Sequence, residues 1–438
     1  MSTELEMQTE QTEAVLISND HEKAWHDGYS SYDADETHPT SPYEKNSIEA
    51  ECWFDGWEDA ADDVEQTERK TSANELKVTS GSYSPDDVTF LIKLLDVQEL
   101  SAEEKERALQ SGEKHYSEII AQEYSPTEEY MDLFHRLVKQ NGQNMADSLV
   151  TLASHMNDNN PDEITLISLM RAGTPVGVLL KRILETRFDR EVKHYSISIV
   201  RDRGIDTNAL DYILKNDSRT PKDCLFVDGW TAKGIITREL KHYVNEYNIS
   251  RNTNLSDTLY VLSDIGGTAD VTASFDDYAI PSGVLNSTVS GLLSRSIWND
   301  DIGLDDFHGA KYYSELEADD YSQKFIDDIM ALCVDNDIKP AQDDKDAANI
   351  YHQSMMTYVS ETMARFNETD INMIKPGIAE ATRVMLRRIP RVLIVRDVND
   401  VDTKHVVQLA KDKGVPIEID TAMPIKAASM ITNMKGND

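Results

Sequence analysis

The amino-acid sequence predicts an α/β protein built around an open, mainly parallel sheet. Four short apolar runs have the length and composition of buried strands: 164–170, 192–200, 225–227 and 258–262. Each run ends in a turn of small and polar residues, and helical patterns follow two of these turns over 176–184 and 235–244. Strands that alternate with helices are typical of a parallel sheet with helices on both faces.

Length and composition set the class of protein. The chain has 438 residues, which is enough for two or three domains, and 39% hydrophobic residues beside 28% charged residues are typical of a soluble protein. No apolar run approaches the ~18 residues of a membrane span, and the first residues show no signal pattern. Three widely spaced cysteines (Cys52, Cys224, Cys333) predict neither a disulfide framework nor a metal cluster, so we expect a reducing cytoplasm.

Charge is distributed unevenly along the chain. The net charge of −37 opposes general binding of nucleic acids or anionic membranes by the whole molecule. Residues 1–70 hold 20 Asp and Glu against 4 Lys and Arg, whereas residues 375–438 hold 8 against 11. This asymmetry indicates separate modules with separate tasks.

The predicted modules follow one another in order. They are a disordered acidic tail over 1–20, a helical hairpin over 21–65, a linker over 66–82, the sheet domain over 83–330, a helical connector over 331–374 and a small α/β domain over 375–438. The hairpin is expected to bring Trp25, Tyr29, Trp53 and Trp57 together. Helical patterns over 101–122 and 126–154 precede the first main strand, and the last domain is expected to hold strands over 391–395 and 415–419 and a helix over 403–413.

Two strand–turn–helix connections carry the candidate site. The predicted site residues are Arg171, Ala172, Gly173 and Thr174 in the first turn, and Asp228, Gly229, Thr231, Ala232, Lys233, Gly234 and Thr237 in and after the second. A carboxylate at a strand end can accept hydrogen bonds from ribose hydroxyls, and the free N–H groups at a helix start can hold a phosphate. The alternative is that both are ordinary connections of an α/β sheet.

Three further stretches are candidates. Arg201 and Arg203 follow the strand at 192–200 and could clamp a phosphate, or could instead pair with their own neighbouring aspartates. The hydroxyl-rich segment 280–295 could line a pocket or pack a helix closely on the sheet. His308 is a candidate general base, although a lone histidine is usually structural.

The wording of the two turns resembles that of the type I phosphoribosyltransferases. MRAGTPVG is similar to their pyrophosphate loop, and FVDGWTAKGIIT is similar to their loop for phosphoribosyl pyrophosphate, with Gly229 in place of the usual second acid. Together with IPSGVLNSTVSGLLSR and DFHGAKYY, these segments resemble a narrower family found beside bacterial tellurium-resistance genes, also labelled cysteine protease StiP.

The resemblance implies a function and a set of roles. It implies an open sheet of phosphoribosyltransferase type and an enzyme that joins a phosphoribosyl pyrophosphate donor to a nucleobase-like acceptor in a stress response, with Mg²⁺ carried by the donor. Asp228, Arg201 and Arg203 would then be catalytic. A phosphoribosyl-binding or nucleotide-binding regulatory protein without catalysis is the alternative, and a cysteine protease is a minor one. The oligomeric state stays open.

The flanking modules carry resemblances of their own. Residues 21–65 resemble the ribosome modulation factor family through an AxxxGY, PY and WxxGWxxA skeleton, but are acidic. Residues 375–438 resemble the Pelota RNA-binding domain, with Ala379 where an Asn is usual. This implies RNA contacts through Lys375, Gly377, Glu380, Arg383, Arg387 and Arg388. The alternative is a small domain that only docks on the sheet domain.

Overall fold

The computed structural model describes most of the chain beyond residue 76. The described residues are 23–32, 40–44, 47, 49–50, 52–54, 56–57, 60, 77–112, 114–334 and 339–432. The chain separates into two compact units, 1–76 and 77–438. The predicted tail over 1–20 lies outside the described residues, as does most of the predicted linker. In the described part of the chain, no helix is both long enough and apolar enough to cross a membrane.

The first unit contains two short helical stretches that approach each other closely. Residues 23–30 are helical, and a Cβ atom on Gly28 would lie 1.9 Å from the carbonyl oxygen of Trp53. A Cβ atom on Gly56 would lie 2.1 Å from the carbonyl oxygen of Trp25 in return. Only glycine permits such contacts between backbones. The described parts of the predicted hairpin therefore do pack together, and Trp25 stacks on Tyr29.

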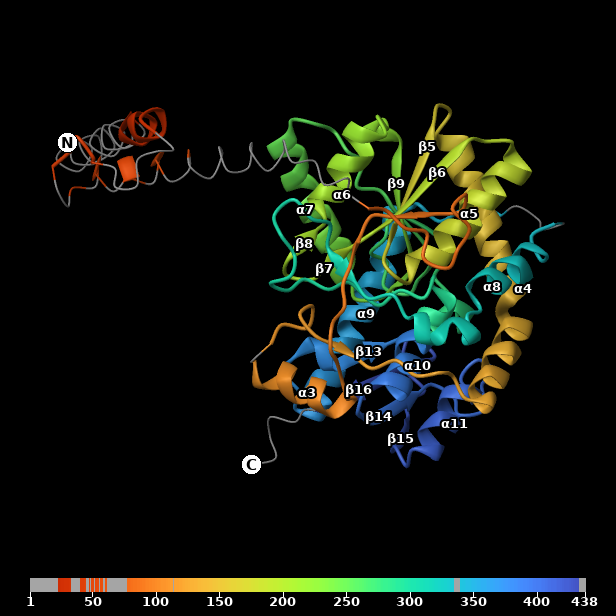
Figure 1. The fold of residues 1–438 in the computed structure, drawn as a ribbon. Coiled ribbons are helices and arrows are strands. Elements are labelled where there is room, and N and C mark those ends of the chain that lie inside the picture. The colour runs from red at the N-terminus through yellow and green to blue at the C-terminus, as the bar shows by residue number, and fades with distance from the viewer. Residues whose placement is uncertain are drawn as a thin grey trace, which may run out of the picture. The chain divides into compact units, whose positions relative to one another are not determined.

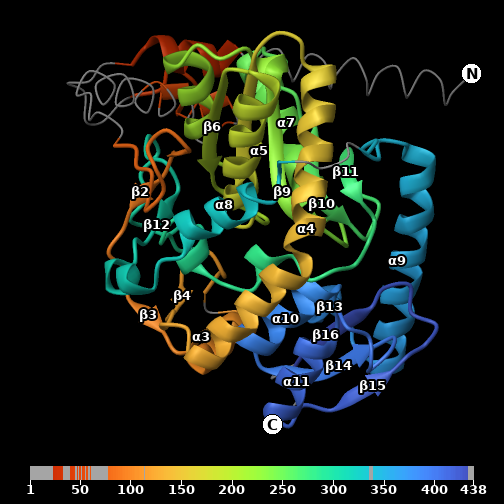
Figure 2. The same ribbon diagram turned by 90° about the vertical axis from the view of Figure 1, so that its right-hand side faces the viewer.

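The second unit is built on a six-stranded parallel sheet, which confirms the predicted fold class (Figures 1 and 2). Its strand order is β1 (Thr89–Phe90), β6 (Val192–Ile197), β5 (Ile164–Leu169), β9 (Cys224–Thr231), β10 (Leu259–Asp264) and β11 (Val271–Ser274). The central strands β5 and β10 are buried along their whole length, as their uninterrupted apolar runs predict.

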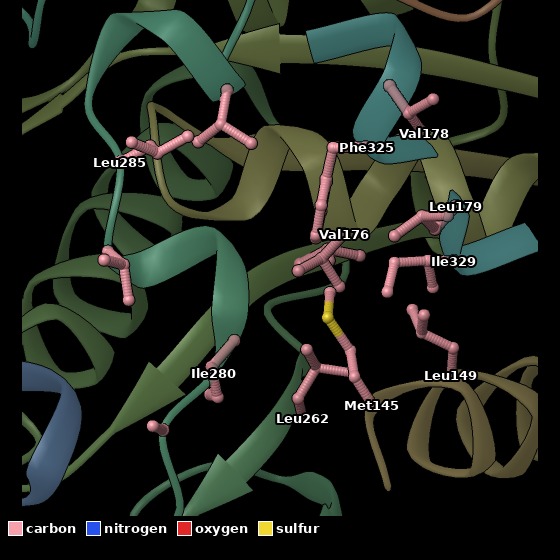
Figure 3. Packing of buried hydrophobic residues seen from close by; sticks show 14 of the residues in the cluster. Met145, Leu149, Val176, Val178, Leu179, Leu262, Ile280, Leu285, Phe325 and Ile329 are labelled. Carbon is pink, nitrogen blue, oxygen red and sulfur yellow. The ribbon is translucent and has the colours of Figure 1, made fainter. Parts of the chain in front are cut away.

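Helices cover both faces of this sheet. On one face lie α4 (Glu128–Asn159), α5 (Gly173–Phe188) and α8 (Ser322–Met330), and on the other lie α6 (Thr207–Asp211) and α7 (Ile235–Arg251). Phe325 from α8 and Met145 from α4 point toward Val176 of α5 from opposite sides (Figure 3). Burial of such side chains is the main stabilising contribution to this domain.

A smaller domain completes the unit. Its sheet has the order β13 (Ile374–Pro376), β16 (Ala427–Ile431), β14 (Pro390–Val395) and β15 (Ile417–Ile419), and its helices are α10 (Ile378–Arg387) and α11 (Lys404–Asp412). The long helix α9 (Lys345–Phe366) leads into it, and α4 runs from the main sheet down to it (Figure 2). Gln140 of α4 donates to Asp402 of this domain at 3.0 Å.

One buried carboxylate ties the smaller domain to the sheet domain. Asp277, which follows β11, accepts hydrogen bonds from the backbone N–H of Ile378 at 2.8 Å and of Lys426 at 2.8 Å. Ile378 begins α10 and Lys426 precedes β16, so this single side chain satisfies two segments of the other domain. Burial raises the pKa of Asp277 to about 6.

The remaining elements are short, and the end of one of them shows that a predicted helix is too long. They are β2 (Lys93–Leu94), β3 (Glu99–Leu100), α3 (Ala102–Ser111), β4 (Ile120–Ala121), β7 (Ile199–Val200), β8 (Gly204–Ile205), β12 (Gly309–Ala310), the π-helical turn Tyr212–Asn216 and several 3-10 turns (Pro221–Asp223, Pro281–Gly283, Ser287–Val289, Ser314–Asp319, Ile371–Met373). The predicted helix over 101–122 is wrong beyond residue 111, because Gly112 adopts a left-handed φ of 80° that ends α3.

Candidate functional site

The two predicted turns meet at the carboxyl edge of the main sheet. Arg171 follows β5 and Asp228 lies near the end of the neighbouring strand β9. A Cβ atom on Gly173 would lie 2.4 Å from the carbonyl oxygen of Val227, so the first turn rests directly on the second strand. This is the edge at which open α/β sheets bind ligands.

The C-terminal domain closes over this edge, with α10 facing it. Trp230 Nε1 of β9 donates to Glu380 of α10 at 3.3 Å, and the guanidinium of Arg383 lies 5.4 Å from the centre of the Trp230 ring. Lys233 Nζ donates to the carbonyl oxygens of Ile371 and Ile374 at 2.6 and 2.7 Å. The site is therefore assembled from both domains.

Two adjoining pockets form this interdomain cleft, and Trp230 belongs to both. The arginine pocket has about 270 Å³ of empty space and is lined by Arg171, Ala172, Pro175, Trp230, Ser282, Gly283, Leu285, Asn286, Val289, Ser290, Arg383 and Arg387. The lysine pocket has about 640 Å³ and is lined by Asp228, Trp230, Thr231, Ala232, Lys233, Gly234, Ile235, Ile236, Thr237, Leu259, Lys375, Pro376 and Glu380.

The walls of the cleft carry an excess of positive charge. Among the described residues, the two linings hold five lysines and arginines against two acids, Asp228 and Glu380. Burial raises the pKa of Asp228 to about 7, so this carboxyl group is only partly ionised at neutral pH. Burial, together with the positive charge of Lys375, lowers the pKa of Lys233 to about 7. An anionic ligand would relieve this crowding of cations.

Each of the cations has a defined environment. Arg171 donates to Asn286 Oδ1 at 2.8 Å and to the carbonyl oxygen of Leu293 at 3.1 Å, and pairs with Glu123 at 2.7 Å. Arg383 pairs with Glu380 at 3.2 Å. Burial lowers the pKa of Lys375, and Glu380 opposes that shift.

Several predicted site residues lie away from the cleft. Thr174 is buried inside the sheet domain, where its hydroxyl contacts Ser196 Oγ at 2.7 Å, and neither Gly173 nor Gly229 lines a pocket. Gly377 and Arg388 are also outside both linings. Ala172, Thr231, Ala232, Gly234 and Thr237 line the cleft, and their role in binding a ligand stays a prediction.

Arg201 and Arg203 are engaged elsewhere. Arg201 pairs with Asp202 at 3.1 Å, donates to Asn372 at 3.0 Å and lies over the ring of Tyr116. Arg203 pairs with Glu118 and donates to the carbonyl oxygen of Trp298 at 2.9 Å. The alternative in which the loop's arginines pair with its own aspartates therefore holds for Arg201, whereas the partner of Arg203 is Glu118 from a distant segment, and neither arginine lines the two cleft pockets.

Other cleft residues were absent from the predicted site. Ser282, Asn286 and Ser290 belong to the hydroxyl-rich segment 280–295, and all three line the arginine pocket. Trp230 departs from the apolar and acidic pattern of the loop that its segment resembles. This departure is the sequence signal that could have pointed to Trp230 as a cleft residue. Glu123 carried no sequence signal, because only the tertiary fold brings it to Arg171.

Cys224, Cys333 and His308 are buried in structural settings. Burial raises the thiol pKa values of Cys224 and Cys333 to about 12. Their Sγ atoms face the carbonyl oxygens of Thr220 and Ile329 within their own segments. His308 stacks on Trp298, and its Nδ1 contacts Ser198 Oγ at 2.8 Å. His308 is absent from both cleft linings, so it is not placed as a general base there.

Metal binding by protein side chains alone finds no support among the described residues. They contain no group of three or more His, Cys, Asp or Glu side chains arranged to hold an ion. The two carboxyl groups of the cleft are a poor ligand set for Mg²⁺, because one is only partly ionised and the other is paired with Arg383. Mg²⁺ carried by a ligand stays a prediction.

Comparison with known proteins gives two family matches and one close relative. The family model described as "Tellurite-like stress resistance cysteine protease StiP" matches residues 81–330, and the "PELOTA RNA binding domain" model matches residues 353–433. The chain is 38% identical over 370 residues to the "Cysteine protease StiP" of Acinetobacter baylyi, which covers 81% of this chain and 94% of that protein.

These matches confirm some sequence resemblances and correct the predicted activity. The resemblance to the tellurium-resistance family and to the Pelota domain is confirmed. The predicted phosphoribosyltransferase activity is wrong, because both the family model and the relative are described as cysteine proteases. The predicted phosphoribosyl pyrophosphate donor and nucleobase acceptor have no support either. The resemblance of residues 21–65 to ribosome modulation factor stays a prediction.

Proposed function

The chain belongs to the StiP family, and we propose that its interdomain cleft binds the end of a single-stranded RNA. The observation that carries this proposal is the orientation of α10. Lys375, Arg383 and Arg387, which the Pelota resemblance implies as RNA contacts, line the cleft. RNA would therefore be held between the two domains.

The size of the cleft supports an RNA end. The lysine pocket is a concavity between the two domains, and its roughly 640 Å³ of empty space includes open solvent, so it can admit part of a single strand but not a double helix. Single-stranded RNA is recognised through unstacked bases that pack on aromatic rings and guanidinium planes. Trp230, with Arg383 over its ring, provides both kinds of surface beside the pocket.

The charge of the cleft supports a phosphate-bearing ligand. The whole chain has a net charge of −37, which repels nucleic acids, yet the cleft linings hold five cations against two acids. A local positive potential inside a negative molecule directs an anion to one place. Because few phosphates would be contacted there, we expect RNA affinity to depend only weakly on salt concentration.

The proposal is tested by fluorescence anisotropy with the full chain and five-nucleotide probes. We expect the single-stranded RNA to bind, and blunt duplex RNA of the same sequence to bind at least about tenfold more weakly. Lys375→Gln should weaken the binding about tenfold, because it removes a charge-assisted contact to phosphate. Lys411→Gln, on the exposed side of α11, is the matched control. Equal weakening by both variants, or tight duplex binding, would contradict the proposal.

A second candidate function is peptide-bond hydrolysis, which the printed name of the relative supports. Cys224 and Cys333 are weak candidates for its nucleophile, because burial raises their thiol pKa values. Cys52 is half-buried and lies outside the matched residues 81–330. Cleavage of unfolded casein by the wild-type chain and by Cys52→Ser, Cys224→Ser and Cys333→Ser tests this candidate. Cleavage that survives all three substitutions rules out a thiol mechanism.

A further inference from the structure

Arg387 is a half-buried cation for which the described residues provide no carboxylate within ion-pair distance. Its Nη2 donates to the carbonyl oxygen of Leu285 at 3.0 Å, while its Nε is buried without a hydrogen-bond partner. The other two arginines of the arginine pocket each have an acid, because Arg171 pairs with Glu123 and Arg383 with Glu380. Arg387 is therefore the cation of this pocket whose charge is left for a ligand.

Ser282 provides a second unpartnered group in the same pocket. Only 8% of its surface is exposed, and its Oγ has no hydrogen-bond partner among the described residues. A buried donor left without an acceptor costs about 1–3 kcal/mol, and a buried unpaired charge costs more. Two such groups in one pocket indicate that something with acceptor oxygens completes it.

The electrostatic surroundings of Arg387 agree with this reading. Burial and the neighbouring charges of Arg383 and Arg171 together lower its pKa to about 9, while Glu123 opposes that shift. A bound anion would reverse the repulsion among the three guanidinium groups.

We propose that the arginine pocket binds the terminal phosphate of the RNA whose end nucleotide occupies the lysine pocket. This inference rests on the proposed function, since it assigns one part of the same cleft. The two pockets share Trp230, so a nucleotide and its phosphate can lie on the two sides of one ring. A terminal phosphate has a single ester link, so it suits the smaller of the two pockets better than a phosphate that continues into chain on both sides.

The test compares five-nucleotide RNAs of one sequence that carry a 5′-phosphate, a 3′-phosphate or hydroxyl groups at both ends. With the full wild-type chain, we expect one phosphorylated end to increase affinity about tenfold or more, as charge-assisted hydrogen bonds to a phosphate would. Inorganic phosphate should compete only at much higher concentration than the phosphorylated RNA. If inorganic phosphate binds as tightly as the RNA, the pocket serves a free anion and the inference is wrong.

Two variants locate the preference in the arginine pocket. Arg387→Gln and Ser282→Ala should each reduce the preference for a phosphorylated end, and Arg387→Gln should reduce it to less than about twofold. Lys411→Gln should keep the full preference, and thermal unfolding checks that each variant is folded. If RNA binds with equal affinity whatever its ends, the terminal-phosphate inference fails while the proposed function stands. If no RNA binds at all, both fail.

Discussion

Two groups of polar side chains, one inside the sheet domain and one in the interdomain cleft, differ in whether their polar atoms have partners. Inside the sheet, His194 contacts Ser168 Oγ at 2.8 Å and the carbonyl oxygen of Asp87 at 2.9 Å, and Thr174 contacts Ser196 at 2.7 Å. In the cleft, by contrast, Ser282 Oγ, Thr237 Oγ1 and Arg387 Nε are buried and have no hydrogen-bond partner among the described residues. A polar network whose members all have partners stabilises a fold, whereas unpartnered groups that line a cleft are available to a ligand.

The largest expected effect comes from His194. His194→Ala removes a buried ring with two hydrogen bonds and leaves a cavity, so we expect a loss of about 3–5 kcal/mol in the free energy of unfolding. Urea denaturation followed by far-UV circular dichroism measures it. The exposed His242→Ala on α7 is the control and should change stability by less than about 0.5 kcal/mol. A small loss for His194→Ala would weaken the contrast between the two regions.

Asp228→Asn is expected to stabilise the protein at alkaline pH. Because burial raises the folded-state pKa of Asp228 to about 7, the folded chain binds the proton more tightly than the unfolded chain does. Wild-type stability therefore falls as the pH rises from about 4 to about 7, and the variant lacks this loss. We expect an advantage of about 2–4 kcal/mol at pH 8 that shrinks toward zero near pH 4. Thermal unfolding of the wild type and the variant at both pH values measures this difference in stability. A stability gain that is independent of pH would contradict the raised pKa of Asp228.

Thr174→Val is expected to cost about 1–2 kcal/mol. The substitution keeps the shape of the side chain but removes the hydroxyl that contacts Ser196 Oγ inside the sheet domain. Because Thr174 lies outside both cleft linings, RNA binding by the folded variant should match that of the wild type. Chemical denaturation and anisotropy measure the two effects, and loss of binding without loss of stability would return Thr174 to the site.

Ser282→Ala should have the smallest effect, a gain in stability of up to about 1 kcal/mol. Its hydroxyl makes no hydrogen bond to the described residues, so its removal takes away a burial penalty and no contact. The same substitution is expected to reduce the preference for phosphorylated RNA ends. Chemical denaturation of both serine and threonine variants in parallel gives the comparison, and a loss equal to that of Thr174→Val would mean that Ser282 is a structural residue.

The sequence predicts the central strands well, because each is an apolar run bounded by polar turns. Strands β5, β6 and β10 start and end within three residues of the predicted runs. Strand β16 was not predicted, since its residues AASMI are small and lack the alternation that marks a strand. The segment after α3 was predicted as helix because its amphipathic pattern continues past Gly112. The helix nevertheless ends there, because Gly112 adopts a left-handed φ.

The sequence predicted that the two turns meet at the sheet edge, but it did not predict that α10 forms a wall of the same cleft. The meeting of Arg171 and Asp228 at one sheet edge follows from the topology of parallel strands, which a sequence can indicate. The inward orientation of α10 depends on how the C-terminal domain docks, and no local pattern encodes that. Arg201 and Arg203 were predicted as site residues because the charges of a loop do not reveal which acids lie nearby in the fold. In the structure, Arg201 forms an ion pair with Asp202, and Arg203 forms one with Glu118.

The carboxylate of Asp277 also bears on how the second unit melts. Separating the smaller domain from the sheet domain would break the hydrogen bonds that Asp277 accepts from the N–H groups of Ile378 and Lys426. Neither half could then lose its order without weakening the other. Calorimetry of residues 77–438 should accordingly record one cooperative heat-absorption peak in place of two.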